Sequence, residues 1–210
     1  MTKTFIFAIT VVLIASSCVS LRSPDSMEYE ALKAAYDAIY PEDFSFGIVR
    51  GNTFYNGDYP EMVASEIHNE MIAQLGTAFR CTYRDMSLVL REMVVVIDRH
   101  GPKAIATDLL AEEELKALCN GSQKASVKLG WDLVNAFLVL RGLDILIDRG
   151  VRAHGPEFEP ITVRREGKTY VFELWAVDSP ATVAFKYSFQ LSPSRFSVRR
   201  LETKGIGMVL

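Results

Sequence analysis

Three histidines lie in settings where acid–base or metal chemistry could occur: His68, His100 and His154. His68 stands between Glu66 and Glu70 in "SEIHNEM", which combines residue types that bind zinc. On a helix the two glutamates share one face, while His68 points about 200° away from each. We therefore expect a solvated helical face here and no metal site.

The other two histidines each precede Gly-Pro, in "RHGP" and "AHGP". A histidine in a loop could meet a substrate, for example in a hydrolase of unrecognised type. The alternative is a position at the C-terminal end of a helix, where imidazolium is favoured. The sequence contains no nucleophile elbow, phosphate loop or dinucleotide fingerprint, so we expect no catalytic residues and no cofactor.

The cysteines are Cys18, Cys81 and Cys119. Neither Cys81 nor Cys119 has a Cys-x-x-Cys partner, which argues against redox catalysis. If the chain is exported, an oxidising compartment favours a disulfide between Cys81 and Cys119. The alternative is that both are separate buried thiols that act as small apolar residues.

The N-terminus has the features of an export signal. Lys3 precedes an uncharged apolar run from Phe5 to Ala15, which is shorter than the roughly 20 residues of a membrane span. That length suits the hydrophobic region of a signal peptide, and small residues follow it. Plain secretion, with cleavage after Ser17 or Ser20, and an uncleaved anchor are the alternatives to the lipid anchor considered next.

The stretch "ASSC", residues 15–18, resembles the lipobox of bacterial lipoproteins, although leucine is commonest at the position of Ala15. The resemblance implies a signal peptide over 1–17, a lipidated Cys18 and a tether over 18–26. Multiple acyl chains would anchor the protein stably to a membrane. Neither Val19 nor Ser20, directly after Cys18, is an aspartate, so the resemblance implies the outer membrane and the periplasmic face of the cell envelope.

Composition narrows the class of protein. The chain has 210 residues, 49% of them hydrophobic, and a net charge of −3. That apolar content supports a folded core and excludes general disorder. Acids and bases are interspersed without a basic run, so a nucleic-acid partner is not expected.

Helical spacing predicts a mainly helical first part. We expect a helix from Met27 to Pro41, capped by Asp25 and Glu28, and a second that begins at Asp58. Further helices are predicted through residues 88–97 and 107–119. The stretch 126–148 is apolar nearly all round and predicts a long, buried central helix. Within it, "LVLRGLDILIDR" (138–149) is similar to "LVLREMVVVIDR" (88–99), through duplication of a helix pair or by chance.

The pattern then changes to period two, which predicts strands at 161–165, 169–177, 183–191 and 196–202. The predicted fold is α+β: N-terminal helices and the central helix, packed on a C-terminal four-stranded antiparallel meander. Residues 27–210 would form a single domain with a helical part, 27–153, and a sheet part, 158–210.

Two groups on the predicted sheet are candidate sites. Its aromatic residues either form a core under the helices or line a pocket for a small apolar ligand, for which the candidates are Phe172, Trp175, Phe185 and Tyr187. Four bases lie on or near the last predicted strand, where they protect an edge from aggregation or bind an acidic partner: Arg195, Arg199, Arg200 and Lys204.

These observations lead to one main hypothesis. We expect a lipid-anchored envelope protein that binds another protein and is not an enzyme, in the manner of assembly accessories or immunity proteins. A carrier of a small apolar ligand and a hydrolase are the alternatives.

Overall fold

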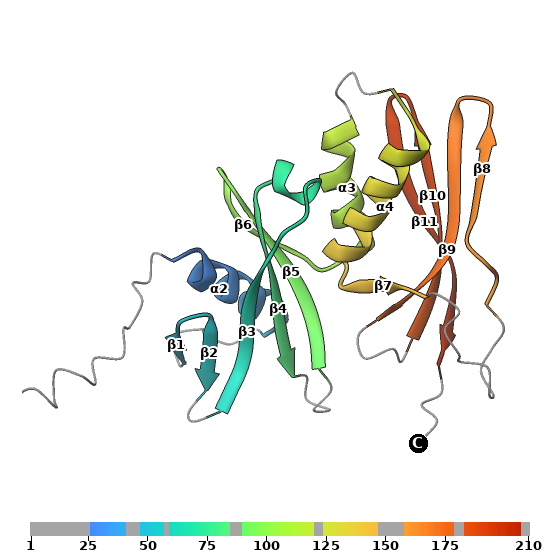
Figure 1. Cartoon of the computed structure of the whole chain (residues 1–210). Helices are drawn as coiled ribbons and strands as arrows, with labels where there is room; N and C mark the ends of the chain where they lie inside the picture. Colours follow the sequence, from blue (N-terminus) through green and yellow to red (C-terminus); the bar gives the residue numbers. More distant parts are fainter. Residues whose placement is uncertain are drawn as a thin grey trace, which may run out of the picture.

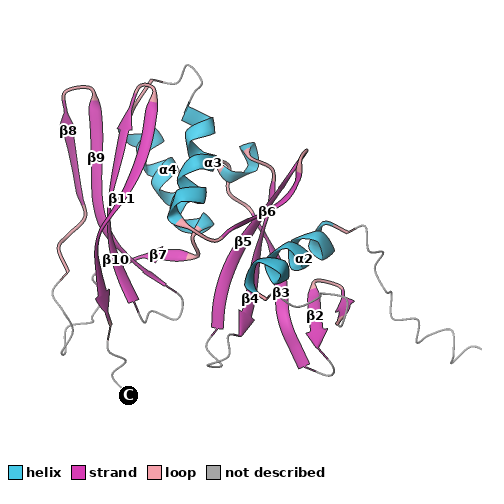
Figure 2. Cartoon of the chain, turned by 180° about the vertical axis from the view of Figure 1, so that it is seen from behind, coloured by secondary structure: helices cyan, strands magenta, loops and turns pink. Residues whose placement is uncertain are grey.

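The computed structural model describes residues 26–40, 47–56, 59–84, 90–119, 124–146, 158–178 and 183–206. These residues form two antiparallel sheets and three α-helices (Figures 1 and 2). The elements in chain order are α2 (Met27–Ile39), β1 (Ile48–Arg50), β2 (Thr53–Asn56), β3 (Tyr59–Ile67), the 3₁₀ turn η2 (Ile72–Gln74), β4 (Thr77–Arg84), β5 (Leu90–Asp98), β6 (Gly101–Ile105), α3 (Asp108–Cys119), α4 (Val127–Leu140), β7 (Leu143–Ile145), β8 (Thr162–Glu166), β9 (Thr169–Asp178), β10 (Val183–Ser192) and β11 (Arg195–Gly205).

Strands β1 to β6 form the N-terminal sheet, in which each strand pairs with the next along the chain. The C-terminal sheet has the order β11-β10-β9-β7, and β8 also pairs with β9. The elements stack in layers: α2, the N-terminal sheet, the α3 and α4 pair, and the C-terminal sheet (Figure 1). None of the described helices is long and apolar enough to cross a membrane.

The predicted fold class is therefore wrong. Residues 58–97, predicted as helices, contain β3, β4 and β5, so residues 27–153 are not a helical part. The predicted central helix over 126–148 ends at Leu140, where Gly142 adopts φ +61° and the chain enters β7. The four C-terminal strands lie where period two places them, but they belong to a five-stranded sheet.

Burial on both faces explains why the N-terminal strands resemble helices in sequence. Val94 and Val96 of β5 pack in the core between the sheets, whereas Val95 packs under α2. Both faces of the strand are thus apolar, and the alternation that marks a half-exposed strand is lost. A continuous apolar run cannot be distinguished from a buried helix by its period alone.

The helices begin where short polar side chains cap them. Ser26 is the N-cap of α2, and its hydroxyl accepts a hydrogen bond from the backbone N–H of Tyr29 (3.2 Å). Ser126 does the same for α4, with the N–H of Leu129 (3.2 Å). The predicted cap Asp25 lies outside the described residues.

Helix α4 approaches the C-terminal sheet closely at Gly130. A Cβ atom at this position would overlap the ring of Phe172, which is fully buried and contacts Trp131 at a centroid distance of 5.3 Å. The lack of a side chain at Gly130 thus sets the spacing between α4 and β9.

We expect Gly130→Ala to destabilise the protein, although alanine is the better helix former by about 1 kcal/mol. Overpacking should lower the free energy of unfolding by about 1–3 kcal/mol. Urea unfolding measures the change, and Asn135→Ala, at an exposed position of the same helix, is the control. A Gly130→Ala variant as stable as wild type would contradict the close packing.

Candidate functional site

The connection between β3 and β4 builds a hollow on the surface. The side-chain oxygen of Asn69 accepts hydrogen bonds from the N–H groups of Met71 (3.0 Å) and Ile72 (3.1 Å), which starts η2. Gly76 then has φ +151°, and a Cβ atom there would overlap the carbonyl oxygen of Ile97. Asparagine and glycine therefore fix the path of this turn over the end of the N-terminal sheet.

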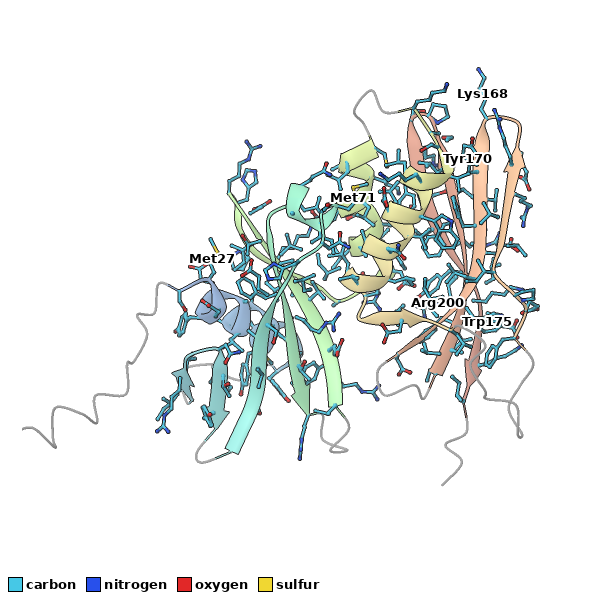
Figure 3. All side chains as sticks on the ribbon, viewed as in Figure 1. Met27, Met71, Lys168, Tyr170, Trp175 and Arg200 are labelled. Carbon is cyan, nitrogen blue, oxygen red and sulfur yellow. The ribbon has the colours of Figure 1, made fainter. Side chains whose placement is uncertain are left out.

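Two adjoining hollows flank the turn, and we call them together the turn groove. The larger, of about 920 Å³, is lined by Met27, residues 66–70, residues 73–78 and residues 97–99. The smaller, of about 430 Å³, is lined by residues 68–71, Gln74, Leu129, Asp132 and Asn135. Met27 at the start of α2 and Met71 beside η2 line the larger and the smaller hollow, respectively (Figure 3).

Carboxylates outnumber cations in the lining of the turn groove. Among the described residues of the lining, the acidic ones are Glu66, Glu70, Asp98 and Asp132, and Arg99 is the single arginine or lysine. Arg99 is turned toward its neighbour, because its Nε donates to Nε2 of His100 at 3.0 Å. The groove therefore presents negative potential to a ligand or partner.

His68 lies in the turn groove and not on the helical face that the sequence predicted. Glu66 is in β3, whereas His68 and Glu70 lie in the turn, so the three do not share a helix. His68 Nδ1 is 3.9 Å from Glu66 Oε1, and its side chain is 83% exposed. Among the described residues, no group of three or more potential ligands could hold a metal ion.

His100 does not lie at the C-terminal end of a helix, which was one of the two positions considered for it. His100 lies exposed in the turn between β5 and β6, where its backbone N–H donates to Asp98 Oδ1 at 2.6 Å. His154 and the predicted lipidation site Cys18 lie outside the described residues.

Cys81 and Cys119 are free thiols in the structure. Cys81 packs under α2, where its thiol donates to the carbonyl oxygen of Ala31 (3.6 Å) and burial raises its pKa to about 12. Cys119 lies in the core on the opposite face of the N-terminal sheet. The sheet thus separates the two thiols. This arrangement agrees with two separate buried thiols and not with a disulfide between them.

The four aromatic residues considered as a pocket are divided between two faces of the C-terminal sheet. Phe172, Phe185 and Tyr187 face α3 and α4, where rings such as Phe137, 5.4 Å from Tyr187, fill the space. Trp175 packs on the opposite face. Of the two interpretations, the structure supports an aromatic core.

Trp175 is covered by charged side chains and by Phe158. Its indole N–H donates to Oε2 of Glu159 at 2.6 Å, and Lys204 Nζ lies 4.6 Å from the centroid of its ring. The indole hydrogen bond, with the help of Lys186, lowers the pKa of Glu159 to about 2. This cluster holds the segment before β8 against the sheet.

The four bases predicted to bind a partner do not form one patch. Arg200 faces the helices, where it stacks on Phe185 at 4.7 Å, whereas Lys204 lies over Trp175 on the other face. Arg195 and Arg199 are exposed. The register shift between Lys186 and Tyr187 contributes to this division, because a bulge changes which residues of β11 face each side.

Asp108, the first residue of α3, joins four elements in what we call the Asp108 network. Its carboxylate accepts hydrogen bonds from Arg141 Nε (2.7 Å), Arg200 Nε (3.0 Å) and the hydroxyl of Tyr187 (3.2 Å). Arg141 also donates to the carbonyl oxygen of Ile105 at 3.5 Å. The sequence predicts a helix that starts at Thr107 or Asp108, but nothing in it indicates these distant partners.

Comparison with protein-family models, curated proteins and solved structures gives no match. The turn groove is the candidate functional site, because the other charged and aromatic clusters described above are occupied by contacts within the fold.

Tyr187 should make the protein sensitive to alkali. Burial and the charge of Asp108 raise the pKa of its phenol from 10.0 to about 12. Between these values the unfolded chain has lost the proton that the folded chain keeps, so stability falls as pH rises. We expect a loss of about 1 kcal/mol per pH unit in this window.

Urea unfolding at several alkaline pH values tests this expectation, with Tyr187→Phe as the comparison. The variant should be less stable at neutral pH but lose less stability between pH 10 and 12. The Cys81 thiol contributes a similar loss in both proteins, because its pKa is also raised to about 12. Identical slopes for the two proteins would show that Tyr187 titrates as it does in the unfolded chain.

Proposed function

We propose that the protein is exported, anchored to the cell envelope through a lipid on Cys18, and binds another protein through the turn groove without catalysing a reaction. The observation that carries the binding role is the groove itself: an open surface hollow with half-buried apolar residues, which we call its floor, and exposed charged residues, which we call its rim. Interfaces commonly combine an apolar centre with a polar rim in this way.

The position of Met27 links the groove to the anchor. Met27 lines the groove and is 51% exposed. Even a fully extended chain from Cys18 to Met27 spans at most roughly 30 Å. An anchored protein would therefore hold its groove near the membrane surface, where a partner in the same envelope can reach it.

Lipidation is tested by mass spectrometry of the mature N-terminus. We expect a diacylglyceryl group on Cys18 and recovery in the detergent phase, because multiple acyl chains bind a bilayer stably. Cys18→Ser should be recovered in the aqueous phase. An unmodified N-terminus that begins after Cys18 would disprove the anchor.

Binding is tested by a photo-crosslinking amino acid in the anchored protein in cells. At Ala73, which is exposed in the groove, we expect a discrete adduct with one envelope protein. At Leu109, which is 60% exposed on α3 and does not line the groove, the same probe should give no such adduct. Equal products from both positions, or none from Ala73, would contradict a partner at the groove.

A further inference from the structure

The turn groove combines two kinds of surface. The lining of its larger hollow includes the apolar residues Ile67, Leu75 and Ile97, together with Met27. The rim carries Glu66, Glu70 and Asp98, and the smaller hollow adds Asp132 from α4. A suitable occupant must therefore offer both apolar surface and positive charge.

Lysine and arginine side chains have this character. Their alkyl stems cover apolar surface while their charged ends stay in water and meet acids at the rim. Such rim charges increase the rate of association and favour partners of complementary charge. The anionic headgroups of an envelope membrane would be repelled by the same carboxylates.

We infer that the turn groove takes a basic, amphipathic segment of the protein partner, with alkyl stems on the floor and cationic ends at Glu66, Glu70, Asp98 and Asp132. This inference rests on the proposed function, because it names the chemistry of the partner at the same groove. The rim acids act together, so the effect of removing several should exceed that of removing one.

The test uses the full mature chain and two fluorescently labelled peptides. One peptide alternates lysine with alanine, and the other alternates glutamate with alanine. Fluorescence anisotropy should show saturable binding of the lysine peptide alone, and the binding should weaken as salt is added, because exposed charges are screened.

Two variants with equal net charge separate the groove from general attraction. The groove variant is Glu66→Gln, Glu70→Gln and Asp132→Asn, and the control variant is Glu30→Gln, Glu113→Gln and Asp144→Asn. The three control positions are exposed and line neither hollow of the groove. They match the groove positions in exposure except in one pair, because Asp132 is half-buried whereas Asp144 is exposed. We expect about tenfold weaker binding of the lysine peptide to the groove variant and unchanged binding to the control.

Several outcomes would overturn the inference. Equally weakened binding of the lysine peptide to both variants would indicate attraction by net charge alone. Saturable binding of the glutamate peptide would show that the groove does not select a basic partner. Binding to anionic vesicles that is lost in the groove variant would identify a membrane as the occupant. Formation of a dimer that the groove variant disrupts would identify a second copy of this chain.

Cross-linking from Ala73 distinguishes failure of the inference from failure of the proposed function. If the adduct persists in the groove variant, the groove has a partner but the partner's basic charge is not what it recognises. If the adduct is absent in wild type as well, the proposed function fails together with the inference. Urea unfolding of both variants confirms that differences in binding do not come from lost stability.

Discussion

The Asp108 network is the interaction on which the arrangement of the layers depends. Asp108 follows the last strand of the N-terminal sheet, Arg141 ends α4, and Tyr187 and Arg200 lie in the C-terminal sheet. One carboxylate thus holds both sheets and the helix layer in register. Hydrogen bonds to a charged group are roughly twice as strong as neutral ones, and removing one partner leaves the others unsatisfied. Apolar packing supplies the bulk of the stability, but it is less directional.

Sequence patterns predicted this structure well where the spacing of apolar and polar residues is regular. Helices α2 and α3 and strands β8 to β11 lie near their predicted positions, because helical spacing and period two marked them. The N-terminal sheet was missed because Val94, Val95 and Val96 are all buried. The two similar stretches 88–99 and 138–149 illustrate the limit: the first contains β5, whereas the second contains the end of α4 and then β7. Tertiary packing, and not local propensity, decides between these outcomes.

The candidate site was harder to predict than the elements. His68, Glu66 and Glu70 stood out in the sequence, but they were interpreted as a helical face, whereas the chain forms a strand and a turn there. Met27, Asp132 and Asn135 come from distant segments, and only the tertiary fold brings them beside the turn. Of the two interpretations of the aromatic residues, the pocket does not agree with the structure for a related reason: alternate residues of a strand point to opposite faces, so Trp175 cannot share a cavity with Phe172.

The order of the strands has a consequence for how the chain folds as it is made from its N-terminus. Because β1 to β6 pair in sequence order, the N-terminal sheet and α2 can form from local contacts before the rest of the chain has emerged. Until α3 and α4 follow, however, Ala78, Val94 and Val96 on the second face have no cover. Such a partly folded species presents a flat apolar surface to water, and this is the kind of surface that aggregates or recruits a chaperone. Burial of both faces of the N-terminal sheet, which makes its strands hard to recognise in the sequence, therefore also makes the nascent protein dependent on how soon α3 and α4 are synthesised.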